Sequence, residues 1–201
     1  MNHAAPSPPA PPDGDSLDIL YLRRTAAGDR AAFDAFVRRH APVVFRFSNG
    51  ITQDRTLAED VVQQTFLNAF RTAGGFRAES SARSWLLTIA RNTAYRLCKL
   101  RHREEPVEQP LDALGQDAGW SADNPETIAL LAERHDLLQQ ALRKLAPADR
   151  EILILRDIEQ ISGAEAAKAL GLQLPAMKSR LHRARLRLAC ALRTLEEADG
   201  D

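Results

Sequence analysis

The sequence predicts an all-α protein with two small helical domains joined by a flexible linker, the second a helix-turn-helix domain. No segment alternates apolar and polar residues as a half-buried strand does, whereas apolar residues recur at helical spacing along most of the chain. Residues 104–125 hold three prolines and two glycines and keep no sustained period, which is typical of a linker. Residues 145–187 have the pattern of two short helices, a tight turn and a basic helix.

Charge supports the same division. We place the boundaries by composition, as a proline-rich disordered arm (1–16), a first domain (17–103), an acidic linker (104–125), a second domain (126–194) and an acidic tail (195–201). Residues 17–103 carry 15 basic and 7 acidic groups, residues 137–194 carry 11 and 5, and residues 104–136 carry 1 and 9. The net charge of zero therefore conceals two basic blocks, as expected of two nucleic-acid-binding domains. The connector's acids could mimic DNA against one block, although solvated linkers are commonly acidic.

Several classes of protein are disfavoured. No stretch is long and apolar enough to cross a membrane, and the N-terminal residues lack the basic start and apolar run of a secretory signal, so we expect a cytoplasmic protein. Cys98 and Cys190 are isolated, which argues against a disulfide framework or a zinc site. No Gly-rich phosphate loop, carboxylate pair or nucleophile with a histidine stands out. We expect no enzyme activity, no metal, no cofactor and no small-molecule substrate.

The first domain should contain four helices. The first covers 17–24, and the second starts at the N-cap Asp29 and meets Pro42, which either kinks it or begins a turn. Residues 48–50 (Ser-Asn-Gly) are a turn signal. Thr56 and Glu59 fit a capping box for a helix over 57–70, with Leu57, Val61 or Val62, Phe66, Leu67 and Phe70 on one side. Gly74 and Gly75 then end that helix.

The fourth helix, 82–103, has two contrasting faces. Its apolar face should contact the core and consists of Leu86, Ile89, Ala90, Thr93, Leu97 and Leu100. The opposite face consists of Trp85, Thr88, Asn92, Arg96, Lys99 and Arg103. Aromatic rings stack on bases and cations hold phosphates, so this face suits unpaired DNA strands. The alternative is that Trp85 belongs to the core at the start of the helix.

The second domain contains the helix-turn-helix pattern. A helix from Ala148 to about Ile158 follows Pro147, and Ser162 should cap a short helix with Glu165 completing a capping box. Gly171 ends that helix. Residues 174–193 then carry six Lys or Arg and no acid, with an apolar stripe of Leu174, Met177, Leu181, Ala184 and Leu188. Ser179, His182 and Arg183 lie on the outward arc, which either contacts DNA or is simply a solvated helix face.

Two stretches resemble the extracytoplasmic-function (ECF) group of the sigma-70 family, the initiation factors of bacterial RNA polymerase. Residues 57–70 are similar to the region 2.2 pattern AEDLVQEVFLRAY, and residues 76–92 to FRGxSxxxWLxxIARN. Residues 145–156 resemble LPxxxRExxxLR and residues 177–185 resemble VKSRLHRAR, both of region 4. Gln64 stands where the family commonly has an acid. Residues 173–176 replace the frequent SxGT, and residues 82–84 differ from the frequent aromatic before the tryptophan.

The resemblance implies roles that the pattern alone does not give. Region 2.2 would bind the clamp helices of the polymerase largest subunit through Asp60, Gln63, Gln64 and Phe66. The next loop and helix would melt the −10 element through Phe76, Arg77, Trp85, Thr88, Asn92, Arg96 and Lys99. Region 4 would read the −35 element in the major groove through Lys178, Ser179, Arg180, His182 and Arg183, and would touch the polymerase flap. We also expect an anti-sigma factor that covers both basic faces.

The sequence therefore predicts an alternative sigma factor that binds core RNA polymerase and promoter DNA. The second hypothesis is a helix-turn-helix repressor or activator with an N-terminal sensor domain. Such proteins usually dimerise on palindromes, and the first domain here has a basic, aromatic-bearing face where a sensor would have a ligand pocket.

Overall fold

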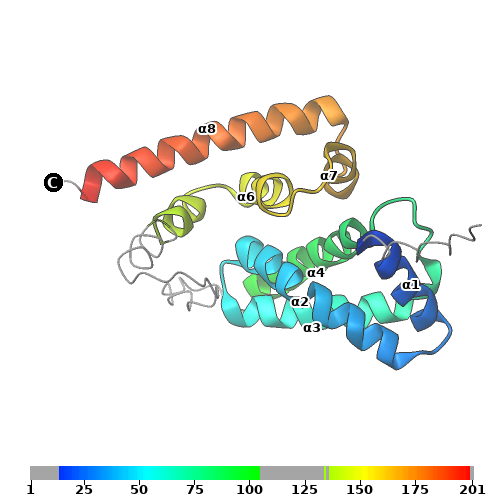
Figure 1. Ribbon diagram of the computed structural model, residues 1–201. Coiled ribbons are helices and arrows are strands. Elements are labelled where there is room, and N and C mark those ends of the chain that lie inside the picture. The colour runs from blue at the N-terminus through cyan, green and yellow to red at the C-terminus, as the bar shows by residue number, and fades with distance from the viewer. Residues whose placement is uncertain (1–13, 105–133, 135, 200–201) are drawn as a thin grey trace, which may run out of the picture.

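The computed structural model describes residues 14–104, 134 and 136–199 (Figure 1). All regular secondary structure in these ranges is helical, which confirms the all-α class. Residues 136–143 are helical, and the remaining elements are α1 (Gly14–Ala26), α2 (Arg30–Thr52), α3 (Arg55–Thr72), the 3₁₀ turn η1 (Ala73–Gly75), α4 (Ala82–Glu104), α6 (Pro147–Leu153), the π-helical segment η2 (Ile154–Ile158), α7 (Gly163–Leu170) and α8 (Leu174–Asp199). Apart from Glu104, the predicted linker 104–125 lies outside the described residues.

The ends of the described helices differ from the predicted boundaries. Helix α1 begins at Gly14, inside the predicted 1–16 arm, and α8 continues to Asp199, into the predicted tail. Within the described ranges, no helix combines the length and the apolar content that a bilayer crossing needs.

Helix α2 is the centre of the first unit, α1 to α4. Its buried face, which includes the fully enclosed Phe36, Val44 and Phe47, contacts α1, α3 and α4. Asp29 caps the helix as predicted, because its Oδ1 accepts a hydrogen bond from the Ala32 backbone N–H at 3.0 Å. Pro42 lies inside α2, which continues across it.

Two predicted signals near the end of α2 are wrong. The turn at residues 48–50 does not form, since α2 continues to Thr52 and ends at Gln53, whose φ of 57° is left-handed. Gly50 serves a tertiary contact instead, because a Cβ there would lie 2.2 Å from Ile154 Cδ1. The N-cap of α3 is Asp54 and not Thr56, with Asp54 Oδ1 accepting from the Leu57 N–H at 2.8 Å.

The second unit, α6 to α8, contains the predicted helix-turn-helix. Ser162 caps α7 by accepting from the Glu165 N–H, and Gly171 ends it with a φ of 65°. Met177, Leu181 and Ala184 of α8 are buried against α6 and α7, as predicted. The continuous helix predicted up to Ile158 is instead α6 followed by η2, a π-helical segment.

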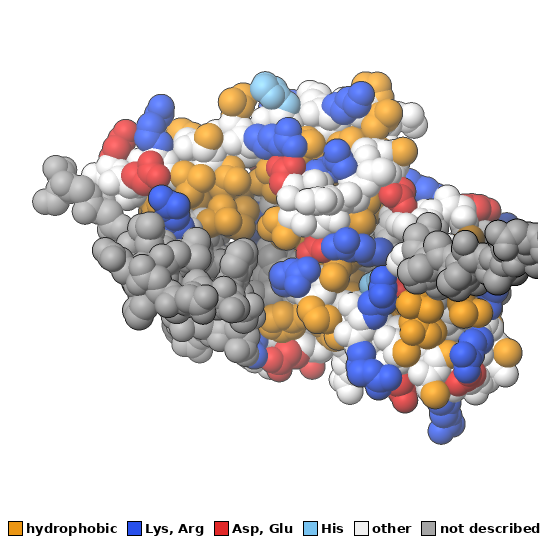
Figure 2. Space-filling view, viewed as in Figure 1, with side chains coloured by type: hydrophobic (Ala, Val, Ile, Leu, Met, Phe, Trp, Pro, Cys, Tyr) orange, Lys and Arg blue, Asp and Glu red, His pale blue; other side chains and the backbone are white. Residues whose placement is uncertain are grey.

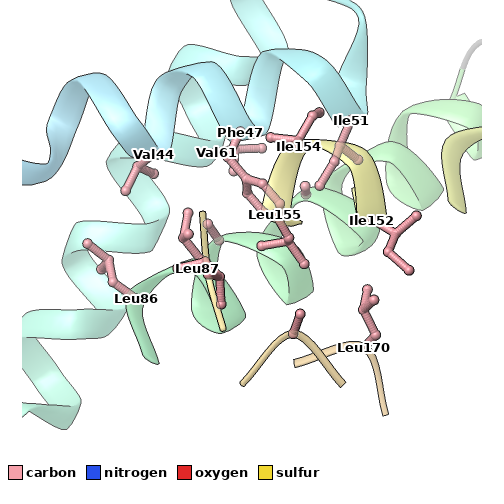
Figure 3. Packing of buried hydrophobic residues seen from close by; sticks show 14 of the residues in the cluster. Val44, Phe47, Ile51, Val61, Leu86, Leu87, Ile152, Ile154, Leu155 and Leu170 are labelled. Carbon is pink, nitrogen blue, oxygen red and sulfur yellow. The ribbon is translucent and has the colours of Figure 1, made fainter. Parts of the chain in front are cut away.

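The two units pack against each other through an apolar centre. Ile154 and Leu155 of η2 lie close to Phe47 and Ile51 of α2, with Leu87 of α4 nearby (Figure 3). All five side chains are at most 4% exposed and belong to one contiguous cluster. The buried core therefore extends across the boundary between the units.

The correct cap of α3 can be tested by comparing two alanine substitutions. Asp54→Ala removes the N-cap bond to Leu57 and the Asp54–Arg101 ion pair, so the free energy of unfolding should fall by about 1–2 kcal/mol in urea titrations. Thr56→Ala is the matched control and should stay within about 0.5 kcal/mol of wild type, because Thr56 is exposed. If Thr56→Ala lowered the free energy of unfolding more than Asp54→Ala does, the Thr56–Glu59 capping box would be supported and the Asp54 cap contradicted.

Candidate nucleic-acid and polymerase interfaces

The outward arc of α8 is available to a partner. Lys178, Ser179, His182 and Arg183 are exposed, whereas Arg180 is half-buried. Figure 2 shows Lys and Arg side chains along the upper part of the molecule, where Figure 1 places α8. A helix with cations and small polar groups on one outward arc has the shape and charge that the DNA major groove accepts.

Two further arginines of this helix anchor it to its own unit. Arg187 pairs with Asp149 of α6 at 2.6 Å, and Arg185 pairs with Asp157 of η2 at 2.5 Å. The apolar stripe was predicted correctly for its three middle residues, whereas Leu174 is 39% exposed because it begins the helix. The stripe and the ion pairs together fix the rotation of α8, and hence the direction of its outward arc.

The polar face of α4 is only partly exposed. Asn92, Arg96 and Lys99 are exposed, and the half-buried Thr88 donates its hydroxyl hydrogen to the Ser84 carbonyl at 2.9 Å. On the opposite face, Leu100 was predicted to contact the core but is 42% exposed. The side chain of Arg103 lies outside the described residues. An amide and two cations therefore follow one another along the open part of this face.

Trp85 is neither fully exposed on the polar face nor fully buried in the core, the two locations that the sequence allowed. It is half-buried against the core, and its ring packs on Phe76 with centroids 5.2 Å apart. The two rings line a hollow of about 380 Å³ with Gly75, Arg77, Glu79, Ser80 and Lys168. The hollow combines aromatic surface with cations, which suits a base and its phosphate. Lys168 comes from α7, so the second unit contributes to its wall.

The predicted polymerase-binding residues of α3 divide into two groups. Asp60 and Gln63 are exposed and Gln64 is half-exposed. Phe66 is 7% exposed and its ring packs edge-on against Phe33, so a direct surface contact through Phe66 is a wrong prediction for this conformation.

Two residues of α3 that were predicted only as part of its apolar side are exposed instead. Leu67 and Phe70 are each 43% exposed. Phe70 lies against Phe33 with ring centroids 5.0 Å apart. Exposed apolar side chains beside acidic and amide groups are typical of a protein-binding surface.

A charged seam between the two units was not predicted. Glu159 is fully buried and accepts from the guanidinium groups of Arg46 and Arg83. Glu151, also buried, accepts from Arg91 and from the Tyr95 hydroxyl. Glu151 and Glu159 stand among other charged residues on either side of the apolar residues 152–155, so the sequence does not distinguish them.

The seam also changes two pKa values. Burial and the adjacent Glu151 charge raise the pKa of Tyr95, against the opposing charges of Arg91 and Arg180. Burial acts to raise the pKa of Glu165, but hydrogen bonds from Ser81 and Ser162 outweigh it and leave that pKa below its usual value. The Ser81 N–H and hydroxyl both donate to Glu165 Oε1, at 2.9 and 2.7 Å.

Other chemistry finds little support in the described residues. Among them no three His, Cys, Asp or Glu side chains gather closely enough to hold a metal ion. Cys98 and Cys190 are both free thiols.

Comparison with known proteins identifies the family of this chain. The family model for sigma-70 region 2 matches residues 36–104, and the model for sigma-70 region 4 matches residues 135–188. RNA polymerase sigma factor NccH of Alcaligenes xylosoxydans is 32% identical over 181 residues, which cover 89% of this chain and 96% of NccH. The chain belongs to the ECF group of the sigma-70 family.

Further relatives support this assignment. ECF RNA polymerase sigma factor SigM of Mycobacterium tuberculosis is 33% identical over 86% of this chain and 83% of its own length. CnrH, solved in complex with the cytosolic domain of CnrY, matches with a TM-score of 0.63 at 26% identity, covering 89% of this chain and 98% of CnrH. RpoE of Bartonella quintana, solved with the anti-sigma factor NepR, gives a TM-score of 0.66 at 28% identity, covering 80% and 96%. The resemblance seen in the two motif blocks is thereby confirmed.

Proposed function

We propose that this protein is a cytoplasmic, non-enzymatic sigma factor that binds core RNA polymerase and directs promoter-specific initiation. The observation that carries the proposal is the presence, in one chain, of two differently built DNA-facing surfaces. Helix α8 presents a polar, cationic arc suited to duplex DNA, and α4 presents an aromatic and cationic face suited to single strands. A repressor with a sensor domain would need only the first surface.

Binding to core polymerase is assigned to α3. Asp60, Gln63 and Gln64 would contact the clamp helices of the largest subunit, and the exposed Leu67 and Phe70 would add apolar area. Phe66 would act from beneath by fixing the position of Phe33. A second polymerase contact, to the flap, fits the groove between α6 and α8, which Leu145, Ala146, Cys190 and Ala191 line.

Promoter recognition is divided between the two units. Lys178, Ser179, Arg180, His182 and Arg183 would read the −35 element in the major groove, where each good base contact is worth about 1–3 kcal/mol of discrimination. The −10 element would be melted against the α4 surface. There the hollow beside Phe76, Arg77 and Trp85 would take a flipped base, and Thr88, Asn92, Arg96 and Lys99 would follow the strand.

We also propose an anti-sigma partner that covers the two basic faces. RpoE, a structural relative of this chain over most of its length, was solved with the anti-sigma factor NepR. Here the exposed apolar residues of α3 and the α6–α8 groove would offer such a partner apolar surface. Recovery of a protein from the native host that competes with core polymerase would support this assignment, and failure to displace polymerase would contradict it.

The direct test of the overall proposal is reconstitution. The purified chain should bind bacterial core polymerase and produce a defined set of start sites on genomic DNA, each with a common −35 and −10 element upstream. A protein that binds palindromic operators as a dimer and leaves core polymerase unchanged would establish the repressor alternative.

If α8 reads the −35 element, replacing one of its arginines should weaken DNA binding and leave polymerase binding unchanged. Arg183→Ala should weaken binding to −35 duplex by about 1–3 kcal/mol while leaving affinity for core polymerase unchanged, because Arg183 lies on the exposed arc. Arg193→Ala is the matched control, since Arg193 lies further along the same helix and pairs with Glu197. Fluorescence anisotropy with duplex DNA measures the effect. Equal loss of DNA and polymerase binding in Arg183→Ala would exclude a specific −35 contact.

If the α4 face binds the melted −10 strand, replacing its residues should affect DNA opening and not the initial binding of duplex DNA. Asn92→Ala and Trp85→Ala should impair open-complex formation more than closed-complex binding, because a flipped base and single strand are bound only after melting. Permanganate footprinting of thymines in the −10 region should show reduced reactivity in both variants. An unchanged footprint in both would contradict the assignment of the α4 face.

A further inference from the structure

The first turn of α8 differs in chemistry from the rest of its outward arc. Leu174, Pro175 and Ala176 form this turn and are all exposed, Leu174 by 39%. The turn contains no acid, and none of its three side chains can make a hydrogen bond. The cations and small polar groups of the arc begin only at Lys178 and Ser179. An exposed apolar turn therefore precedes the polar, cationic part of the same helix.

This turn forms the leading end of the outward arc. On a helix of 3.6 residues per turn, Pro175 lies about 40° from Ser179 and Ala176 lies about 20° from Arg183. Side chains of a helix lean toward its N-terminus, so those of the first turn extend beyond the end of the helix. In helix-turn-helix proteins, the N-terminal residues of the recognition helix contact base edges. The apolar turn thus occupies the part of α8 that should reach deepest into the groove.

The side chains of the turn are poorly suited to the phosphate backbone. Phosphates are bound by cations, by hydroxyl and amide groups and by backbone N–H groups at helix N-termini. Pro175 has no N–H, so the turn also has one backbone donor fewer than usual. The charged group nearest in sequence is Lys178, in the next turn. The apolar turn is therefore better placed against bases than against phosphates.

The major groove offers one apolar group to such a surface, the C5-methyl group of thymine. An apolar side chain placed over any other base edge would cover donors and acceptors without replacing their hydrogen bonds to water, which is unfavourable. Against a thymine methyl, the same side chain removes apolar surface of both partners from water. The chemistry of Leu174 and Ala176 accordingly favours thymine.

Gln173 supplies an independent indication of the same base pair. Its backbone carbonyl accepts from the Met177 N–H at 2.9 Å, which fixes it at the start of the helix. Its side chain is exposed, and the amide group has no hydrogen-bond partner within the described residues. A glutamine amide pairs with N6 and N7 of adenine in the major groove. Adenine is the partner of thymine, so both observations select A·T pairs.

We propose that residues 173–176 read A·T base pairs at the end of the −35 element that the first turn of α8 enters. Leu174 and Ala176 contact thymine methyl groups, Gln173 binds adenine, and Pro175 holds the first turn in its helical conformation. This inference rests on the proposed function, because it requires α8 to lie in the major groove of the −35 element. It assigns a base preference to the residues that replace the frequent SxGT.

Single-atom and single-group changes in the DNA test the proposal. Holoenzyme reconstituted from the full chain and bacterial core polymerase is bound to a duplex that carries the −35 element obtained from the start-site map. Each thymine is replaced in turn by deoxyuridine, which lacks only the methyl group. Each adenine is replaced in turn by 7-deazaadenine, which lacks the N7 acceptor. Fluorescence anisotropy measures the dissociation constant of each duplex.

In wild type, deoxyuridine at a contacted thymine should weaken binding about fourfold, the equivalent of burying one methyl-sized group. Leu174→Ala and Ala176→Ser should each lose this difference at one thymine. Removing a contacted adenine N7 should weaken wild-type binding roughly fivefold or more, and Gln173→Ala should lose that difference. Each variant is compared with itself on two duplexes, so a general loss of stability or affinity does not imitate the result.

Leu186→Ala is the matched control. Leu186 is 58% exposed on the same arc but lies about 18 Å further along the helix, at 1.5 Å per residue. This variant should distinguish thymine from deoxyuridine as wild type does. Circular dichroism establishes that every variant keeps its helices. If Leu186→Ala abolished the distinction as Leu174→Ala does, the assignment to the first turn would be overturned.

Two results would overturn the base preference while leaving the −35 role of α8 intact. One is a wild-type holoenzyme that binds every deoxyuridine duplex as tightly as the thymine duplex. The other is a set of defined start sites whose −35 elements contain no A·T pair. A holoenzyme without defined start sites would instead contradict the proposed function, and the base preference with it.

Discussion

Two carboxylates that are enclosed between helices and must keep their arginine partners constrain the whole arrangement. Glu151 and Glu159 would be unfavourable in an apolar seam without Arg46, Arg83 and Arg91. The pairs therefore fix how the second unit sits on α2 and α4, and through α6 they fix α8. Because α8 is attached to α6 by the Arg187–Asp149 pair, the direction of the outward arc relative to the first unit depends on the same contact.

Most of the secondary structure was predictable because it depends on local chemistry. Asp29, Ser162 and Gly171 act through hydrogen bonds or backbone angles within a few residues, and each was placed correctly. The errors occur where tertiary contact outweighs a local signal. Gly50 looked like part of a turn, but its missing Cβ makes room for Ile154, a residue more than one hundred positions away. Thr56 had the right type for a cap, yet α3 begins at Arg55, so Thr56 lies inside the first turn and Asp54 is the cap.

Among the candidate sites, the arc of α8 was predictable from the sequence, whereas the exposed residues of α3 and the charged seam were not. The outward arc of α8 follows from helical periodicity and a one-sided charge pattern, so four of its five predicted residues are exposed. Periodicity gives only the angle of a residue around its helix, and it does not say which neighbour covers that angle. Phe66 is buried under Phe33 and Leu67 is exposed for this reason. The seam was missed because ion pairs between distant segments leave no periodic trace.

The contacts change the interpretation of the charge pattern along the sequence. The sequence suggested that acids of the connector could mimic DNA, whereas the acids that occupy arginines of the first unit belong to the second basic block itself. That block has a net positive charge because its arginines lie mostly on α8, while Glu151, Glu159 and Glu165 gather on the side that faces the first unit. A net count over a segment averages these two sides and hides the acidic one. A domain can thus carry a basic face toward solvent and an acidic face toward the arginines of its neighbour.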